Sequence, residues 1–287
     1  MRVDLAGAWT DVPPFASRER GAVLNLSIDS YVFGKREEYD KLLNNYVSGP
    51  SGKHRMSSNG INISYWTDLP TGTGLGSSGA LNVVLAKLVN PKLGKVELAE
   101  KAIELARVWG VQGGKQDEYA AAMGGGNLLF FREDETETVP VDISWLDRHL
   151  VVCYTQSTRE GGKIHERVWA GIEDGRLMDL MRELAQVPEV MLERIQARDL
   201  NGIGTLMQAN WEIQKRLDEH VTNDVIENLF KIACDNGACG GKACGAGGGG
   251  CIVFLTEDRL RLMDALHGHA PVIDCKADSD GVIEIKD

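Results

Sequence analysis

The sequence lacks the features that place a chain in a membrane or on nucleic acid. No apolar run in its 287 residues approaches the length of a membrane span, and no secretory signal precedes the first motif. Lysine and arginine form no cluster, and the formal net charge is −11, whereas nucleic-acid binders usually carry a basic patch. We therefore expect a cytoplasmic protein that binds small molecules, with no nucleic acid and no membrane among its partners.

The cysteines lack the spacing of a disulfide framework or of a zinc finger. No two of them form a C-x-x-C pair, and a chain of this length can bury a core without disulfides, so reduced cysteines are expected. Cys239, Cys244 and Cys251 leave a zinc site open, although their spacing fits no known finger and the segment is mostly glycine. His267 and His269 are better explained as a solvated helix end than as metal ligands.

Aromatic residues make up only 6% of the chain, but glycine is abundant, with 33 residues. Four glycines lie within residues 70–80, Pro-Thr-Gly-Thr-Gly-Leu-Gly-Ser-Ser-Gly-Ala. Apolar residues then recur at helical spacing from Leu81 to Leu88, and Ser77 or Ser78 is the expected N-cap. The backbone N–H groups of such a loop at a helix N-terminus can bind phosphate. A plain strand–loop–helix connection is the alternative.

This loop matches neither of two common nucleotide-binding motifs. No lysine follows Gly76, as a Walker A motif requires. The glycine spacing also misses the helix entry of the dinucleotide fingerprint. A phosphate site here would therefore belong to a different class of protein.

The pattern before residue 150 predicts strands and helices around this loop. Strands are expected at residues 21–33 and 61–66, and a helix at residues 95–109. A short helix follows between glycine turns, with Asp117 in its first turn. Asp117 is either an acid that the helix dipole stabilises or a functional carboxylate.

After residue 150 the pattern becomes mostly helical. Residues 160–236 are expected to form helices, with breaks near Gly175, Pro188 and Gly202. A second glycine-rich run, at residues 240–250, is expected to form a tight turn against a ligand or against the first glycine-rich loop. The chain is expected to finish on two strands, at residues 271–275 and 281–285. This order predicts an α+β fold with helices on one face, divided into residues 1–150 and 151–287.

Three motifs, taken in order, resemble the GHMP kinases, the superfamily of galactokinase, homoserine kinase and mevalonate kinase. They are residues 2–11 (Arg-Val-Asp-Leu-Ala-Gly-Ala-Trp-Thr-Asp), residues 70–80 and residues 241–249. The resemblance implies an N-terminal domain like ribosomal protein S5 domain 2 and a ferredoxin-like C-terminal domain. Relatives carry a longer first strand, so part of that strand is expected to lie outside this sequence.

The resemblance also implies a kinase that uses ATP and Mg²⁺. It makes Asp117 the catalytic base and places Arg2 beside the transferring phosphate. It assigns ATP binding to Pro70, Gly72, Gly74, Leu75, Gly76, Ser77, Ser78 and Gly79. It assigns substrate binding to Thr10, Asp11, Lys115, Arg159, Gly245, Ala246 and Gly247. For Arg159, a solvated helix start is the alternative.

The metal ligands implied by the resemblance are Ser78 and a glutamate in the helix before Asp117. Glu104 is the nearest candidate, but its distance along the chain from Gly110 is one residue longer than the family pattern. Glu104 also lies on the helix face opposite the apolar stripe, so a solvated charge is an equal alternative.

The acceptor implied by the resemblance is a sugar or a sugar phosphate. Residues 10–14 and 114–117 resemble D-glycero-D-manno-heptose 7-phosphate kinases, whereas Trp9 resembles L-fucokinases. Lys115 stands where fucokinases tend to have tryptophan, which favours the heptose phosphate, phosphorylated at the anomeric position. A non-catalytic sugar and ATP sensor, and a glycine-rich nucleotide-binding protein of another fold, are the alternatives. A homodimer is left open.

Overall fold

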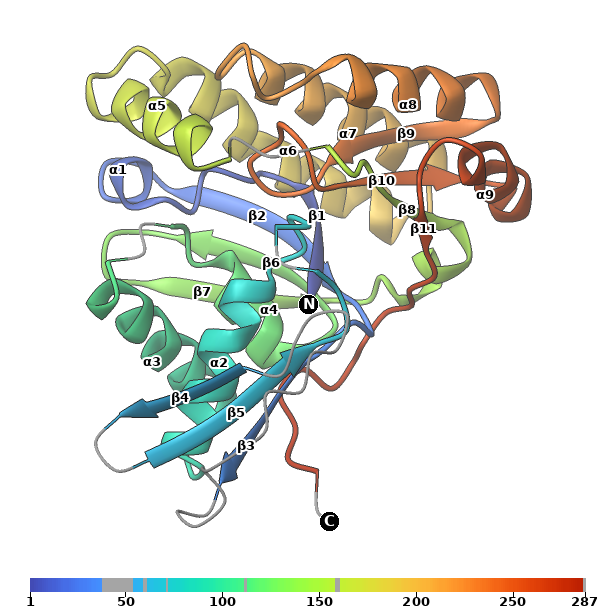
Figure 1. The fold of residues 1–287 in the computed structure, drawn as a ribbon. Helices are drawn as coiled ribbons and strands as arrows, with labels where there is room; N and C mark the ends of the chain where they lie inside the picture. Colours follow the sequence, from blue (N-terminus) through green and yellow to red (C-terminus); the bar gives the residue numbers. More distant parts are fainter. Residues whose placement is uncertain (38–53, 59–60, 71, 111–112, 158–160, 286–287) are drawn as a thin grey trace.

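The computed structural model describes residues 1–37, 54–58, 61–70, 72–110, 113–157 and 161–285. Within them the strands form three antiparallel sheets (Figure 1). The first sheet has the order β1-β2-β6-β7 and contains β1 (Arg2–Ala6), β2 (Gly21–Ser27), β6 (Gly126–Phe131) and β7 (Thr136–Val141). β1 pairs with β2, β2 with β6, and β6 with β7. The elements from β3 to α4 lie between β2 and β6 in the sequence and are not part of this sheet.

Helices cover both faces of this first sheet. One face packs against α2 (Ser77–Val89), α3 (Lys95–Val108) and α4 (Gln116–Met123) through Val23 and Leu129. The other face packs against α6 (Met178–Gln196) through Leu24 and Leu128. The side chains of a strand alternate between its two faces, so β2, which is buried throughout, serves both layers.

The second sheet has the order β11-β8-β10-β9 and lies next to the first one (Figure 1). Its strands are β8 (Leu150–Tyr154), β9 (Ala238–Ala243), β10 (Cys251–Thr256) and β11 (Val272–Ile273). The helices beside it are α5 (Gly161–Glu173), α7 (Leu200–Lys215), α8 (Asp224–Asp235) and α9 (Arg259–His267). Since α6 from the second half of the chain packs on the first sheet, the boundary near residue 150 remains a prediction.

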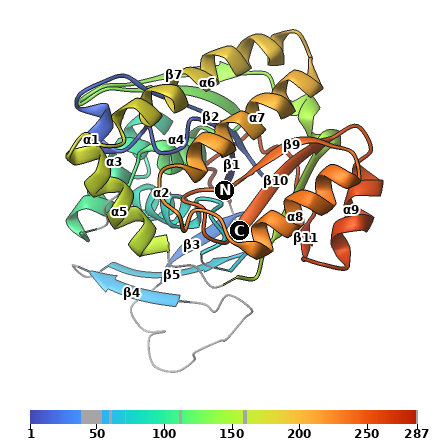
Figure 2. The same cartoon turned by 90° about the horizontal axis from the view of Figure 1, so that it is seen from above.

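The third sheet, β3-β5-β4, packs along α2 at one edge of the molecule (Figure 2). It consists of β3 (Val32–Glu37), β4 (His54–Ser58) and β5 (Ile61–Thr67), and β5 leads into the glycine-rich loop as expected. Two short elements complete the chain: α1 (Pro13–Ala16) and a 3₁₀ helix at Ser144–His149.

Three predicted boundaries were wrong. The expected strand 21–33 is two strands in different sheets, because the chain leaves the first sheet after Ile28, which bridges Ala277. Pro188 does not break α6; a Cβ on Gly7 would come within 2.7 Å of its ring, so Pro188 is held against the first sheet. Residues 281–285 form no strand, and β11 is only two residues long.

The first strand holds a buried ion pair with β9. Asp4 and Lys242 are both fully buried, and the Lys242 ammonium bonds the Asp4 carboxylate and the Ala243 carbonyl oxygen. The other Asp4 oxygen accepts from the Gly245 backbone N–H at 3.1 Å. This pair joins the first and third sequence motifs across the two sheets.

We predict that Lys242→Met lowers the free energy of unfolding by about 3–5 kcal/mol, because it leaves the Asp4 carboxylate buried without its cation. Urea unfolding measures the change. Lys231→Met is the control, because Lys231 pairs with Asp235 on the surface of α8 and its removal should leave the midpoint unchanged. Equal midpoints for parent and Lys242→Met would contradict a structural role for the pair.

Candidate active site

The three sequence motifs meet at a cleft with a volume of about 480 Å³. Four of the segments that line it carry predicted site residues: the β1 end and the turn after it, the glycine-rich loop with the start of α2, the start of α4, and the turn after β9. From the predicted site they supply Arg2, Asp11, Gly72, Gly74, Gly76, Ser77, Ser78, Gly79, Asp117, Gly245 and Ala246. The fold therefore brings most of the predicted residues into one cavity.

The glycine-rich loop reaches α2 through a left-handed residue. Gly76 is the N-cap with φ 75°, and no side chain caps the helix. The expected serine N-cap was wrong: Ser77 is the first helical residue, and Ser77 and Ser78 both line the cleft. Gly72 and Gly74 also have positive φ, of 85° and 78°. A loop of this shape leaves backbone N–H groups at a helix N-terminus, where anions bind.

The second glycine-rich run packs against the first, as expected. A Cβ on Gly74 would lie 2.6 Å from the Cys244 carbonyl oxygen, and one on Gly250 would lie 2.6 Å from that of Thr73. The Cys251 N–H donates to the Thr73 carbonyl oxygen at 2.7 Å. Side chains at these glycines would force the two loops apart.

Arg2 ties the loop to Asp117. Its Nε and one terminal nitrogen donate to the same Asp117 oxygen, at 2.8 and 2.5 Å, and its other terminal nitrogen donates to the Gly74 carbonyl oxygen at 2.6 Å. The Arg2 N–H also donates to the Leu75 carbonyl oxygen. Burial lowers the pKa of Arg2, but the charges of Asp117 and Asp4 outweigh it and raise that pKa overall, so Arg2 remains a cation. Asp117 is about a quarter exposed and faces the cleft.

Asp11 sits on the opposite side of the start of α4. Its carboxylate accepts from the Gln116 N–H at 3.0 Å, and a Cβ on Gly114 would collide with it. Burial, followed by the charge of Asp117, raises the pKa of Asp11 to about 6 against the hydrogen bond from Gln116. The Gln116 side-chain oxygen also lines the cleft and is buried without a hydrogen-bond partner.

Glu118 is a cleft residue that the sequence analysis missed. It is 5% exposed, and the Asn82 amide donates to its Oε1 at 3.0 Å. Burial, and then the charge of the adjacent Asp117, raises the pKa of Glu118 to about 8. Ser78 and Asn82 are one turn apart on α2, and this spacing was the available signal for a shared polar face.

Trp9 and His165 form the far wall of the cleft. Their ring centroids are 5.2 Å apart, and the Trp9 indole N–H is buried without a hydrogen-bond acceptor. Trp9 has φ 82°, which is rare for a residue with a side chain and is held by the turn after β1. His165 gave no signal in the sequence because it comes from α5, far along the chain.

Several predicted site residues do not line the cleft. The Thr10 hydroxyl is buried and bonds the Gly7 and Ala22 carbonyl oxygens. Gly247 packs against Val221. Glu104 is exposed on the outer face of α3, where it pairs with Lys101 at 2.5 Å. Three further predicted residues are absent from the lining: Pro70, Leu75 and Lys115. Arg159 lies outside the described residues.

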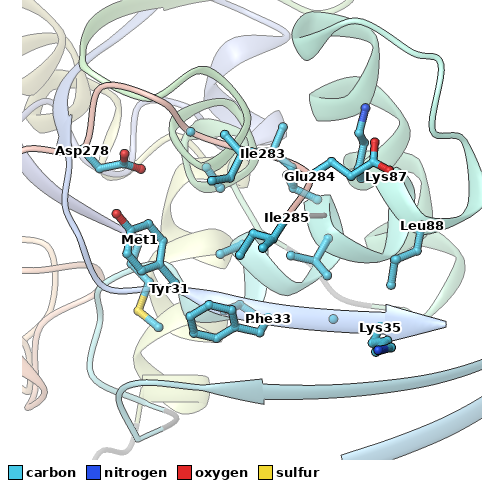
Figure 3. Close-up of a pocket in the computed structure, with 18 of the residues that line it drawn as sticks. Met1, Tyr31, Phe33, Lys35, Lys87, Leu88, Asp278, Ile283, Glu284 and Ile285 are labelled. Carbon is cyan, nitrogen blue, oxygen red and sulfur yellow. The ribbon is translucent and has the colours of Figure 1, made fainter. Parts of the chain in front are cut away.

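A larger cavity of about 840 Å³ lies against a different face of α2 (Figure 3). Tyr31, the β3 residue Phe33, and Ile283 and Ile285 of the C-terminal segment are among the residues that enclose it. None of the predicted site residues that the structure describes lines this cavity. The smaller cleft, which holds the charged and glycine-rich motifs, is therefore the candidate active site.

Within the described residues, no three histidine, cysteine or acidic side chains gather into a metal site. None of the six cysteines forms a disulfide in the described part of the chain, and the open zinc site at Cys239, Cys244 and Cys251 has no support there. In the same part of the chain, no helix is both long and apolar enough to cross a lipid bilayer.

Two family models match the chain. The GHMP kinases N terminal domain matches residues 41–125, and the GHMP kinases C terminal domain matches residues 191–268. The D-glycero-alpha-D-manno-heptose 7-phosphate kinase of Campylobacter jejuni is 30% identical, over 90% of this chain and 88% of its own length. The bifunctional fucokinase/GDP-fucose pyrophosphorylase of Arabidopsis thaliana is 23% identical over 94% of this chain but 31% of its own length.

A solved structure agrees with these matches. The crystal structure of a sugar kinase from Campylobacter jejuni, 28% identical, superposes with a TM-score of 0.70 over 98% of this chain and 94% of its own. The chain belongs to the GHMP kinase family, and the predicted GHMP kinase fold is confirmed. It is a phosphotransferase with a hydroxyl acceptor, a sugar or sugar-phosphate kinase of that family.

We predict that Asp11→Asn changes how stability depends on pH. Folding raises the pKa of Asp11 from 3.8 to about 6. Between these two values the folded state binds the carboxyl proton more tightly than the unfolded state does, so the free energy of unfolding falls as pH rises. Asparagine does not titrate, so the variant lacks this loss. Between pH 4 and pH 7 its free energy of unfolding should rise by about 3 kcal/mol relative to that of the parent.

Urea unfolding across this range measures the difference. Asp179→Asn is the control, since this carboxylate is exposed at the start of α6, and its curve should run parallel to that of the parent. A constant difference between Asp11→Asn and the parent at all pH values would contradict the prediction.

Proposed function

We propose that this protein transfers a phosphoryl group from MgATP to the anomeric hydroxyl of D-glycero-D-manno-heptose 7-phosphate. The observation that carries the choice of acceptor is Lys115. This residue is only 6% exposed, and its ammonium has no hydrogen bond or ion pair with any described residue. It lies between two cleft residues, Gly114 and Gln116, although Lys115 itself is not among the residues that line the cleft. A nearly buried cation without an anion fits the phosphate end of a sugar phosphate.

The nucleotide would lie along the glycine-rich loop. Gly74, Gly76 and the following backbone N–H groups present donors to phosphate oxygens at the start of α2. Mg²⁺ takes oxygen ligands from one or two side chains and from substrate phosphates. Ser78 lines the cleft and would supply one such oxygen from its hydroxyl group, so the ion fits here. When bound, the ion neutralises charge on the transferring phosphoryl group.

The reaction needs a base for the acceptor hydroxyl. The hydroxyl oxygen forms the new bond to the γ-phosphorus, the bond to the β-phosphate oxygen breaks, ADP leaves, and Asp117 takes the proton. Arg2 holds the Asp117 carboxylate in place, and as a cation beside the loop it also offsets phosphate charge. Asp11 and Gln116 offer oxygen acceptors for the other sugar hydroxyls.

A second candidate acceptor is L-fucose. The observation that favours it is Trp9, whose indole presents an apolar face and an unpaired N–H at the cleft, suited to a sugar ring without a phosphate. The similarity to the fucokinase part of the Arabidopsis protein points in the same direction. Lys115 is the reason for ranking this acceptor second.

We predict that Asp117→Asn lowers turnover by roughly 10²–10⁴-fold, the range for loss of a positioned general base. The substitution keeps the shape and the hydrogen bond from Arg2. Coupled ADP release measures turnover, and calorimetry should find the ATP affinity little changed. If Asp117 is only a helix-start acid, turnover stays intact and a small loss of stability is the sole effect.

We predict that Lys115→Met lowers kcat/KM for the heptose 7-phosphate by about 10- to 100-fold, because one hydrogen bond to a charged group is lost. Activity on the unphosphorylated heptose should not change. A screen of sugars and sugar phosphates with MgATP tests the acceptor itself. Faster turnover of L-fucose than of the heptose phosphate by the parent protein would overturn the proposed acceptor.

A further inference from the structure

We propose that the larger cavity binds a free small molecule with an apolar body and one anionic group, such as a carboxylate or a sulfonate. This site lies outside the proposed function, because among the described residues it shares no lining residue with the active-site cleft. Its volume of about 840 Å³ falls within the usual range for small-molecule pockets, roughly 300–1,000 Å³. Three features of the cavity carry the inference: its apolar walls, its exposed isoleucines and its charges.

The walls of the cavity combine an aliphatic helix face with aromatic rings. Residues 80, 83, 84 and 88 of α2 line it and recur at helical spacing, so they form one apolar stripe. Phe33 of β3 and Trp66 of β5 also line it, and their rings are stacked with centroids 5.4 Å apart. A Cβ on Gly34 would lie 2.4 Å from the Val84 side chain, so β3 and α2 are in direct contact here. Walls of this kind suit an apolar ligand.

Two isoleucines of the C-terminal segment are exposed where they line the cavity (Figure 3). Ile283 is 57% exposed and Ile285 is 70% exposed. The chain is held just before them, because the Val282 N–H donates to the Ala122 carbonyl oxygen at 3.3 Å. A ligand in the cavity would remove part of this apolar surface from water, which favours binding.

The charged residues of the cavity are unevenly distributed. Lys35 and Lys87 lie toward one end with Glu284, whereas Asp278 lies toward the other end (Figure 3). Arg36 follows Lys35 on β3 and adds a third cation to the lining. Three cations and one carboxylate give the first end a net positive charge. This charge attracts an anionic group and orients the apolar body toward the other end.

Fluorescence titration with two related probes tests the site. Anilinonaphthalene sulfonate has an apolar aromatic body and a sulfonate, and phenylnaphthylamine has the same body without the charge. The folded protein should bind a single molecule of either probe, and it should bind the sulfonate more tightly. A saturating non-hydrolysable ATP analogue should displace neither probe. Displacement would place the probes in the active-site cleft and overturn the proposal, and a parent that binds neither probe would overturn it as well.

Two substitutions at the cavity have matched controls elsewhere on the surface. Ile285→Asp should weaken binding of both probes by about 10-fold, because an apolar contact is lost. Its control is Leu260→Asp, since Leu260 is 72% exposed on α9 and is not part of the cavity lining. Lys35→Gln should weaken binding of the sulfonate by about 2- to 5-fold, the range for one exposed charge pair, and leave phenylnaphthylamine binding unchanged. Its control is Lys231→Gln on α8.

Urea unfolding of each variant guards against a loss of structure, since anilinonaphthalene sulfonate also binds partly folded chains. All these side chains are exposed, so the midpoints should equal that of the parent. Equal probe affinity for Ile285→Asp and the parent would overturn the site, as would equal losses in Ile285→Asp and Leu260→Asp. A Lys35→Gln variant that weakens both probes alike, or neither, would overturn the anionic group of the ligand.

Discussion

The candidate site depends on charges of alternating sign that are buried along the first strand. Lys242 bonds Asp4, the Asp4 carboxylate lies 3.7 Å from the Arg2 guanidinium, and Arg2 bonds Asp117. Each of the buried charges is compensated only because its neighbour is in place. Arg2 and Asp4 belong to the first motif, Lys242 belongs to the third, and Asp117 lies on α4. Burying any one of these charges without its partner would destabilise the fold, so the pairs fix the relative positions of these segments.

Close backbone contact does the rest of the positioning. The Asp4 carboxylate and the Gln214 amide hold Gly245 from two sides, and the loop at residues 72–76 fits against the turn after β9 only because Gly74 and Gly250 lack side chains. A loop held by such contacts needs less ordering when a ligand binds, which reduces the entropic cost of binding.

Residue patterns could predict the loop, the short helix with Asp117 and the packing of the two glycine-rich runs, because glycine spacing and helical periodicity are local signals. They could not predict the N-cap of α2, because the sequence Gly-Ser-Ser is compatible both with a left-handed glycine cap at Gly76 and with a serine cap one or two residues later. They also missed that α6 continues through Pro188, since proline normally signals a helix break and its tolerance here depends on packing against the first sheet. His165 and Glu118 reach the cleft through tertiary contacts that no local pattern encodes.

The start of α4 gives adjacent carboxylates different surroundings. Asp117 faces the Arg2 guanidinium and is partly exposed at the cleft. Glu118 faces the Asn82 amide, is nearly fully buried, and has no cation of its own. A helix turns by about 100° per residue, so neighbouring side chains point to different parts of the same cleft. The two adjacent carboxylates of this short helix therefore have different partners: Asp117 has a cation in place at the cleft, whereas Glu118 has a neutral amide.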